Sequence, residues 1–456
     1  MMVDASLFKR YDIRGEVGRA LTESAAELIG RAFGTYLERA DVYKAVVGHD
    51  NRLSSRGLAD AVIRGLLATG CQVTDLGQVA TPVVYWSAVE GGNIGGVMVT
   101  GSHLKPIMNG FKLSIGKRNL YGEQLQVLRQ MIMEGDFTAG QGELAHDETV
   151  NERYLAMIRA RLQHARPLTI VVDAGNGMGG VYAVPLLQSL GHRVIPLYCE
   201  PDGMYPHHQP DPQDAANLRD LAERVRETGA DLGLAFDGDA DRVGVVDETG
   251  TLIPADRVLV LLARDILTRH PGAAVVADVL TSQVLFDEVA RAGGRPVIWS
   301  SGHSMVKAKM EEEGALLGGE MSGHIFLAEG YYGFDDGVFV GGRIVQIIAA
   351  QDKPLSALMA TVPTLWATPE YRPYCPDERK AAVIAAVHAA LKDRYPINDV
   401  DGVRITFERG WGLLRASNTE PVLSLRFEGE TEADALAYKR IVQEALKQAY
   451  PEVGEF

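Results

Sequence analysis

The stretch Leu168–Tyr198 reads LTIVVDAGNGMGGVYAVPLLQSLGHRVIPLY and decides the fold class. A run rich in β-branched residues comes first, a glycine-rich turn follows it, and an apolar segment of helical length leads to a second β-run. This order of strand, turn, helix and strand is typical of α/β proteins. The stretch therefore predicts an α/β fold.

The same alternation extends in both directions along the chain. Upstream, residues 44–50 and 95–102 have the composition of buried strands, and residues 54–70 have the apolar spacing of a helix. Downstream, residues 273–280 and 295–302 predict strands on either side of another helix. The prediction of α/β structure therefore covers most of the chain.

Length and composition divide the chain into domains. Domains usually hold roughly 100–200 residues, so the length implies about three or four of them. The segment 367–380 is rich in proline and charge, as linkers are, and a helix, strands and a last helix follow it in α+β order. We place the domains at 1–150, 151–252, 253–366 and 367–456.

The charge balance and the cysteines limit the class of protein. A formal net charge of -15 argues against nucleic-acid binding, which needs a basic face. The three cysteines are widely spaced and form neither a zinc motif nor a disulfide framework. No signal peptide or membrane-spanning apolar stretch is recognisable. We expect a cytoplasmic protein with no nucleic-acid or membrane partner.

An acidic loop follows a predicted strand in LGLAFDGDADR, residues 232–242. Asp237, Asp239 and Asp241 alternate along it, and carboxylates this close repel one another unless a cation lies among them. Hard oxygen ligands of this kind select Mg²⁺ or Ca²⁺. The loop therefore predicts a divalent metal site.

Three interpretations of the acidic loop compete. Together with Glu248, the aspartates match ligand positions of an EF-hand, but Arg242 stands where that motif needs glycine and the flanks resemble strands. A strand followed by Asp-x-Asp also begins aspartyl-phosphate phosphatases, in which one aspartate is the nucleophile. The third interpretation is a Mg²⁺ site formed by three carboxylates and a phosphate.

Two further loops have donors and acceptors suited to a sugar phosphate. In GEMSGH, Glu320 and Ser322 suit hydrogen bonds with sugar hydroxyls, although an ordinary glycine-bounded turn explains them equally well. In RASNTEP, the guanidinium of Arg415 suits a phosphate, although a plain turn also favours this composition. Further donors follow it at Ser417, Asn418 and Thr419.

The most informative turn follows the predicted strand 95–99. There the apolar run ends in Thr-Gly-Ser-His, with Ser102 and His103, and Lys112 follows behind an Asn-Gly turn. Together with the ordered motifs YDIRG, DGDADR, GEMSGH, GFDDG and RASNTEP, this turn gives a pattern over nearly the whole chain. The sequence resembles the α-D-phosphohexomutase superfamily, in particular its bacterial phosphomannomutase/phosphoglucomutase branch.

The resemblance implies a fold and a set of roles. The fold has three related α/β domains with mixed sheets and a smaller C-terminal α+β domain around a central cleft. Ser102 is implied as the phosphoserine, with His103 beside it and Lys112, its pKa lowered, as general acid/base. The phosphate on Ser102 and the three aspartates would bind Mg²⁺, with Arg242 close by. The remaining implied residues of the cleft are Arg14 near the reacting groups, Tyr11 and His303 on the walls, Glu320, Ser322 and His324 around the sugar, and Arg415, Ser417, Asn418 and Thr419 around the distal phosphate.

The implied reaction interconverts hexose 1-phosphates and hexose 6-phosphates through a 1,6-bisphosphate. Mg²⁺ and glucose 1,6-bisphosphate are therefore the expected cofactor and activator, and hexose phosphates the partners of a monomer or dimer. Met321 and Asn418 stand where the phosphoglucosamine mutase branch usually has Gln and Gly, which favours mannose and glucose phosphates.

The chain departs from the family pattern at several positions. The serine loop of the family commonly reads Thr-Ala-Ser-His-Asn-Pro, whereas here Gly101 replaces Ala and Leu104-Lys105 replaces Asn-Pro. Gly101 would loosen the loop, and Lys105 adds a charge near the phosphate. Leu280 stands where relatives of this branch often carry a lysine, and Ala240 replaces a glycine of the metal loop.

Three other functions stay open from the sequence. One is a phosphoglucosamine mutase, the second a phosphatase with Asp237 or Asp239 as nucleophile, and the third a sugar-phosphate-binding protein without turnover. Only the first of these shares a requirement for Ser102 with the main hypothesis, so loss of Ser102 separates mutases from the other two.

Overall fold

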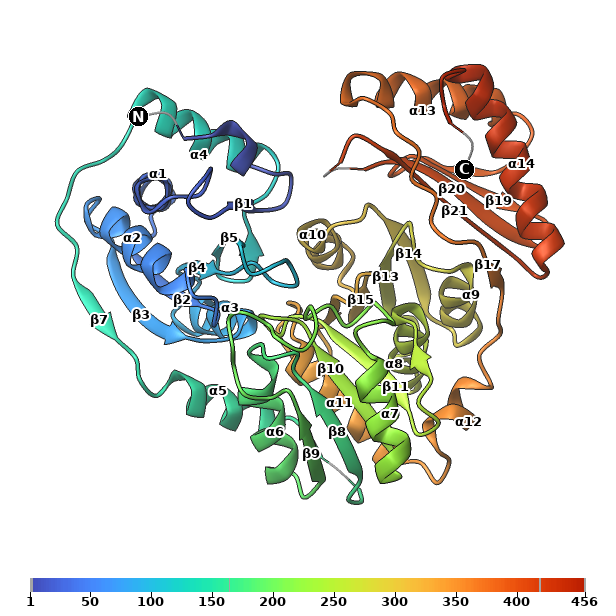
Figure 1. Ribbon diagram of the computed structural model, residues 1–456, viewed down its shortest axis with the longest axis horizontal. Helices are drawn as coiled ribbons and strands as arrows, with labels where there is room; N and C mark the ends of the chain where they lie inside the picture. Colours follow the sequence, from blue (N-terminus) through green and yellow to red (C-terminus); the bar gives the residue numbers. More distant parts are fainter. Residues whose placement is uncertain (1–2, 164, 418–419, 455–456) are drawn as a thin grey trace. The chain divides into compact units, whose positions relative to one another are not determined.

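The structure is a computed structural model, and Figure 1 shows its ribbon. The described residues are 3–163, 165–417 and 420–454. The chain forms two compact units, which are described separately. Unit 1 comprises Met1–Val258 and Ser322–Met359, and unit 2 comprises Leu259–Met321 and Ala360–Phe456. Among the described helices, none combines the length and the hydropathy that a membrane crossing needs.

The N-terminal sheet of unit 1 has the strand order β1-β5-β4-β2-β3-β7, with β6 paired to β5. It is a mixed sheet, because β2 is parallel to both β3 and β4 while β5 is antiparallel to β4 and β1. Since β2 and β4 end at the same edge, the loops after these strands are neighbours. The strands are β1 (Ile13–Glu16), β2 (Lys44–His49), β3 (Gln72–Gln78), β4 (Gly95–Val99), β5 (Met108–Ile115), β6 (Arg118–Asn119) and β7 (Leu144–His146).

A capping residue and two glycines explain how the first helices of unit 1 start and pack. The hydroxyl of Thr22 accepts from the Ala25 amide at the start of α1, where Thr is a favoured cap. Helices α1 and α2 approach closely at Gly30 and Gly65, where an added Cβ would collide with the main chain of the other helix. The helices are η1 (Ala5–Leu7), α1 (Glu23–Arg39), α2 (Ser55–Leu67), α3 (Thr81–Glu90), α4 (Glu123–Glu134) and α5 (Val150–Arg159).

A second sheet of unit 1 has the order β12-β11-β10-β8-β9. Strands β8, β9 and β10 are parallel, and β11 turns back antiparallel to β10. The strand–turn–helix–strand prediction for residues 168–198 is confirmed by β8, α6 and β9. The elements of this part are β8 (Thr169–Asp173), α6 (Gly179–Ser189), β9 (Arg193–Leu197), α7 (Arg219–Thr228), β10 (Leu232–Phe236), β11 (Val243–Asp247) and β12 (Leu252–Ile253). Unit 1 also contains, outside this sheet, β16 (Ile325–Leu327), α11 (Gly337–Ala349) and α12 (Leu355–Met359).

Unit 2 contains three parallel strands of one sheet and a separate antiparallel sheet. Strand β13 is parallel to β14 and to β15, and the C-terminal sheet has the antiparallel order β17-β21-β20-β19-β18. Apolar side chains of α13 and α14 form one core with this second sheet. The elements are α8 (Ala255–Arg269, which starts in unit 1), β13 (Ala274–Asp278), α9 (Gln283–Arg291), β14 (Arg295–Trp299), α10 (His303–Glu313), β15 (Leu317–Gly319), β17 (Trp366–Ala367), α13 (Asp377–Leu391), β18 (Ile397–Asn398), β19 (Val403–Phe407), β20 (Gly410–Ala416), β21 (Leu423–Gly429) and α14 (Glu432–Ala449).

Candidate active site

The serine loop connects β4 to β5 and turns Ser102 toward the acidic loop. Ser102 is fully buried, and its hydroxyl donates to Asp237 Oδ2 at 2.8 Å. His103 Nδ1 lies 3.2 Å from the same hydroxyl oxygen. Burial, together with the charges of Arg242 and Arg14, lowers the pKa of His103 well below its ordinary value. A neutral histidine therefore stands beside the serine hydroxyl.

The acidic loop connects β10 to the antiparallel β11. Strands on both sides exclude the EF-hand interpretation, which requires helices there. Gly238 lies directly against the serine loop, because an added Cβ would come within 2.5 Å of the Ser102 carbonyl oxygen. Ala240 has a positive φ of 59°, a conformation that costs an alanine about 1–2 kcal/mol. Replacement of the usual glycine at this position is therefore more than a change of side-chain size.

The three aspartates of this loop meet the geometric requirements of a cation site. Asp237, Asp239 and Asp241 are fully buried and offer oxygens that all lie within 4.8 Å of one another. In the described part of the chain, Oδ1 of Asp239 and Oδ1 of Asp241 have no hydrogen-bond partner. Burial and the two neighbouring carboxylates raise the pKa of Asp237 well above its ordinary value. Such a donor set suits a hard divalent cation such as Mg²⁺.

Lys112 supplies positive charge to this cluster. From β5 its ammonium group contacts Asp239 Oδ2 at 2.7 Å and also pairs with Asp241. Burial by itself lowers the pKa of Lys112, but the two carboxylates outweigh burial and raise the pKa well above its ordinary value. The expectation of a lowered pKa is therefore wrong for this arrangement, because the sequence does not reveal that strand β5 faces the acidic loop.

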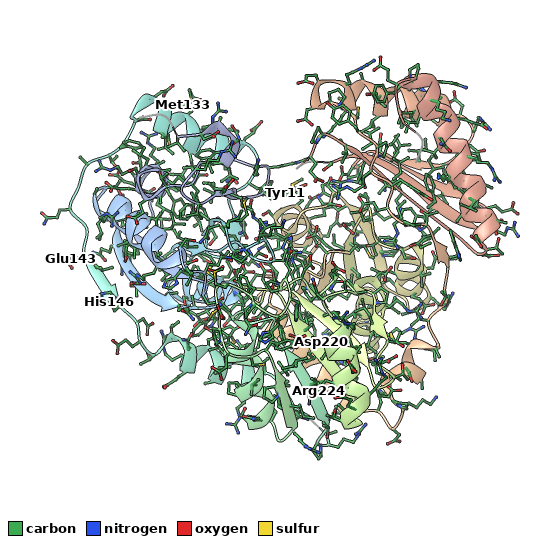
Figure 2. All side chains as sticks on the ribbon, in the orientation of Figure 1. Tyr11, Met133, Glu143, His146, Asp220 and Arg224 are labelled. Carbon is green, nitrogen blue, oxygen red and sulfur yellow. The ribbon has the colours of Figure 1, made fainter. Side chains whose placement is uncertain are left out.

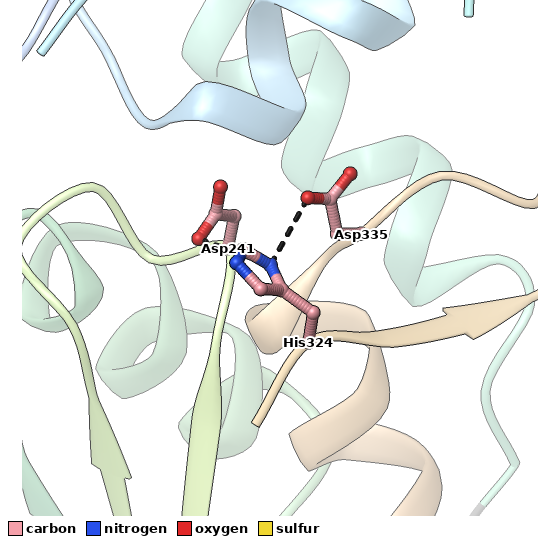
Figure 3. Close-up of side chains that lie close together, drawn as sticks. All are labelled: Asp241, His324 and Asp335. Atoms are coloured by element: carbon pink, nitrogen blue, oxygen red, sulfur yellow. Dashed lines mark ion pairs between the residues drawn. The ribbon is translucent and has the colours of Figure 1, made fainter. Parts of the chain in front are cut away.

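Arg242 forms a hydrogen bond with a histidine of unit 1, and this histidine in turn contacts a carboxylate. Its Nε donates to Nε2 of His324 at 3.0 Å, and its Nη1 lies 3.4 Å from the Ser322 carbonyl oxygen. On the other side of the imidazole ring, Nδ1 lies 3.1 Å from Asp335 Oδ2 and 3.6 Å from Asp241 Oδ1. Figure 3 shows these three side chains close together. Since Nε2 accepts a hydrogen bond, the neutral ring carries its proton on Nδ1. Burial and then the charge of Arg242 lower the pKa of His324, which is consistent with this neutral form.

The N-terminal candidates also lie in unit 1. Tyr11 precedes β1 and is labelled in Figure 2; it is partly buried. Arg14 lies on β1, and its Nε pairs with Asp12 Oδ2 at 2.5 Å. The charge of Arg14 acts on His103, so this arginine belongs electrostatically to the serine loop.

The remaining described candidates lie in unit 2, around two carboxylates. Glu320 Oε1 accepts from the Gly302 amide at 2.6 Å and so fixes the turn that precedes His303. Asp401 Oδ2 accepts from Nη2 of Arg415 at 3.0 Å and from the Ser301 amide at 3.2 Å. Asp401 therefore ties Arg415, near the end of β20, to the turn before α10.

Other predicted positions of unit 2 are less informative. Ser417 is almost fully buried, and its hydroxyl accepts from the Glu420 amide at 3.2 Å. Asn418 and Thr419 lie outside the described residues. At Leu280, the carbonyl oxygen lies 3.4 Å from Nη1 of Arg426.

Asp50 and Arg52 are site residues that the sequence does not single out. In HDNR they resemble ordinary loop residues, yet both are buried and both bind the serine loop. The feature that could have identified them is the parallel pairing of β2 with β4, because it places residues 49–52 (HDNR) beside residues 100–103 (TGSH). That Gly101 loosens the loop stays a prediction, but a Cβ at this position would lie 2.5 Å from Cζ of Arg52. The glycine makes room for this arginine.

Comparison with known proteins identifies the family. Models of the phosphoglucomutase/phosphomannomutase family match the chain in order: α/β/α domain I at residues 5–137, domain II at 152–250, domain III at 254–365 and the C-terminal domain at 373–445. The chain belongs to this family. The predicted membership is thereby confirmed, and so is the fold class of three α/β/α domains with mixed sheets and a C-terminal domain with an antiparallel sheet.

Individual members of the phosphoglucomutase/phosphomannomutase family match over nearly the full length. A phosphomannomutase/phosphoglucomutase of Pseudomonas aeruginosa is 46% identical over 447 residues, which cover 97% of this chain and 96% of that protein. A phosphoglucomutase of Neisseria gonorrhoeae is 41% identical over 436 residues, 94% of each chain. The crystal structure of a phosphoglucomutase/phosphomannomutase family protein from Burkholderia thailandensis has a TM-score of 0.94 at 39% identity, covering 99% of each chain.

Proposed function

We propose that this chain interconverts hexose 1-phosphates and hexose 6-phosphates through a phosphoserine at Ser102 and a hexose 1,6-bisphosphate. The interconversion is the activity of its family, so the chain is an isomerase of the phosphomannomutase/phosphoglucomutase type. One observation carries the mechanism: the buried Ser102 hydroxyl lies 2.8 Å from Asp237, within a cluster of three carboxylates and one lysine. Phosphoryl transfer needs this kind of positioned charge more than covalent help from the protein.

In this proposal the acidic loop binds the metal ion. Asp237, Asp239 and Asp241 would hold Mg²⁺ together with the phosphate on Ser102. A bound cation of this kind neutralises the crowded phosphoryl oxygens. The buried carboxylate oxygens without hydrogen-bond partners support the assignment.

Lys112 moves the proton at the serine oxygen. Its raised pKa keeps it charged at neutral pH. It would give a proton to the Ser102 oxygen as the phosphoryl group passes to a sugar hydroxyl, and would regain a proton as that hydroxyl loses its own. When the second phosphate of the bisphosphate returns to Ser102, the same two proton transfers run in reverse. His103, neutral and 3.2 Å from that oxygen, accepts or donates a hydrogen bond without adding charge. Arg242 stabilises the phosphoryl group, held in orientation by His324.

Further residues are assigned to substrate binding. Around the sugar we assign Glu320, Ser322, His324, Tyr11 and His303, and near the reacting groups we assign Arg14. Around the distal phosphate we assign Arg415, Ser417, Asn418 and Thr419. Mannose and glucose phosphates are the preferred substrates, as the names of the relatives suggest, and glucose 1,6-bisphosphate is the activator. The domain boundaries near residues 150, 252 and 366, a cytoplasmic location and a monomeric or dimeric state stay predictions.

The test is a phosphorylation and turnover assay on matched variants. Wild-type protein, Ser102→Ala and the exposed-site control Ser189→Ala are incubated with Mg²⁺ and glucose 1,6-bisphosphate, and the peptides are weighed by mass spectrometry. We expect phosphate on the Ser102 peptide of the wild type and the control, and mutase turnover in these two proteins only. Turnover in Ser102→Ala, or phosphate on an aspartate, would refute the mechanism in favour of a phosphatase. A higher kcat/KM on glucosamine phosphate would assign the chain to that substrate instead.

A further inference from the structure

The main chain at Ser102 adopts a conformation that needs external support. Its φ is +49°, in the left-handed region that residues other than glycine rarely adopt. Strain of this kind persists only where the surroundings enforce it. Thr100 Oγ1 accepts from the Ser102 amide at 2.8 Å, which holds one side of the residue. A second group is needed on the carbonyl side of Ser102 to hold this conformation.

Arg52 is that group. Its guanidinium is fully buried and donates through Nη2 to the carbonyl oxygens of Ser102 at 2.6 Å and Leu104 at 2.7 Å. Through Nη1 it donates to the carbonyl oxygens of Lys105 at 2.7 Å and Met108 at 3.1 Å. One planar side chain thus binds the loop from Ser102 to the first residue of β5. Its rigid fork of donors suits simultaneous bonds of this kind better than an ammonium group does.

Asp50 balances the buried charge and extends the network. Its Oδ2 accepts from Nε of Arg52 at 3.1 Å, from the Thr100 hydroxyl at 2.8 Å and from the Gly101 amide at 3.2 Å. A buried ion pair is tolerated when additional hydrogen bonds satisfy both partners, as they do here. The pair Asp50–Arg52 therefore holds the amide and the carbonyl sides of the loop at once.

We propose that Arg52 is a positioning residue for phosphoryl transfer, which fixes the strained main chain at Ser102 and so aims the hydroxyl at Asp237. The proposal rests on the proposed function of Ser102. The contacts of Arg52 with this loop are made to main-chain oxygens and not to the hydroxyl, so it acts through the conformation of the loop. For the same reason the network is independent of the side chains at 104 and 105, where Leu and Lys replace the Asn-Pro of the family.

The first test compares Arg52→Met and Arg52→Lys with a control on the same helix–loop segment. Arg64→Met is the control, since Arg64 is about half-exposed and pairs loosely with glutamates of α1. The rate at which glucose 1,6-bisphosphate phosphorylates Ser102 is measured by mass spectrometry, and kcat and KM are measured separately. A misplaced reacting group can cost about 10²-fold, so we expect Arg52→Met to lower kcat and the phosphorylation rate by about that factor. Arg52→Lys should be intermediate, KM should change by less than about twofold, and the control should match the wild type.

A rescue variant separates positioning from a general loss of stability. Lys105→Pro keeps the carbonyl oxygen but fixes φ near −65°. Residue 105 already precedes Pro106, which favours extended backbone there, so the change is compatible with the chain. If Arg52 acts by restricting the loop, adding Lys105→Pro to Arg52→Met should recover about tenfold of the lost kcat. If Arg52→Met does not fold, the same comparison is made in Arg52→Lys.

The outcomes distinguish this inference from the proposed function. A folded Arg52→Met that phosphorylates Ser102 at the wild-type rate overturns the role of Arg52 while leaving the mutase mechanism intact. A wild-type protein that is never phosphorylated on Ser102 overturns the mechanism itself. If Arg52→Met is slow and the double variant with Lys105→Pro has an equally low kcat, the positioning role is also refuted. Restricting the loop should have raised the kcat of the double variant.

Discussion

Replacing Lys112 by methionine removes the ammonium group that the buried Asp239 and Asp241 carboxylates share. Both aspartates are fully buried, and Lys112 is 3% exposed, so solvent screens this arrangement little. Removal of one partner from a buried ion pair typically destabilises a protein by about 3–5 kcal/mol, since the remaining charge is left uncompensated. We expect Lys112→Met to lose that amount in the presence of EDTA.

Mg²⁺ should compensate part of this loss. The cation would bind the same carboxylates, and saturation at about one hundred times Kd stabilises a folded state by about 2.7 kcal/mol. Without Lys112 competing for those oxygens, the variant should bind Mg²⁺ more tightly than the wild type. For a domain of about 150–250 residues, 1 kcal/mol shifts Tm by about 2–4 °C. We therefore expect Tm to fall by about 6–20 °C in EDTA and by about 1–9 °C in Mg²⁺.

Differential scanning calorimetry with and without Mg²⁺ measures both effects, and Lys105→Met serves as the control because Lys105 is exposed. The pKa of Lys112 is raised, so its contribution is complete below its unfolded value and is lost only as pH rises through the higher folded value. The difference between variant and wild type should therefore be constant from about pH 6 to 9. An equal loss of Tm with and without Mg²⁺ would show that Lys112 and the cation do not share the carboxylates, and would refute this reasoning.

Three further changes test other parts of the molecule. Burial raises the pKa of Asp336 to about 6, so the folded protein binds a proton at this carboxyl more readily than the unfolded chain does. The free energy of unfolding should therefore rise as pH falls from about 6 toward 4. Asp336→Asn should remove up to about 3 kcal/mol of this pH dependence, as measured in acid titrations monitored by circular dichroism. Asp401→Asn weakens the partner of Arg415, and we expect KM for the hexose phosphate to change several-fold while the rate of Ser102 phosphorylation stays constant in the mass assay. His324→Phe removes the acceptor that orients Arg242, and steady-state kinetics should show kcat lower by about 10–100-fold with the protein still folded.

The sequence predicted the elements and the chemistry of the individual loops well. The β-branched runs, the Asp-Gly-Asp-Ala-Asp loop and the order of the motifs are local signals, and local signals can be read without knowing the fold. The prediction of a cation site at Asp237, Asp239 and Asp241 agrees with their burial and proximity, because carboxylates this close repel one another unless a cation lies among them.

Long-range pairing explains what the sequence did not predict. Arg52 lies fifty positions from the carbonyl of Ser102 that it binds, and only the register of β2 against β4 brings them together. The direction of the pKa shift of Lys112 depends on two aspartates more than one hundred positions away. Contacts of this kind depend on the tertiary structure, so periodicity and motif spacing do not contain them.

The close approach of Gly238 to the Ser102 carbonyl has an evolutionary consequence. Any side chain at 238 would push the two loops apart, so neither loop can change shape at this contact unless the other changes with it. The departures from the family pattern in these loops fall at Gly101, Leu104, Lys105 and Ala240, and leave this contact unchanged. Two loops on different sheets are thus expected to accumulate substitutions as a single unit, with variation permitted around their shared contact and excluded at it.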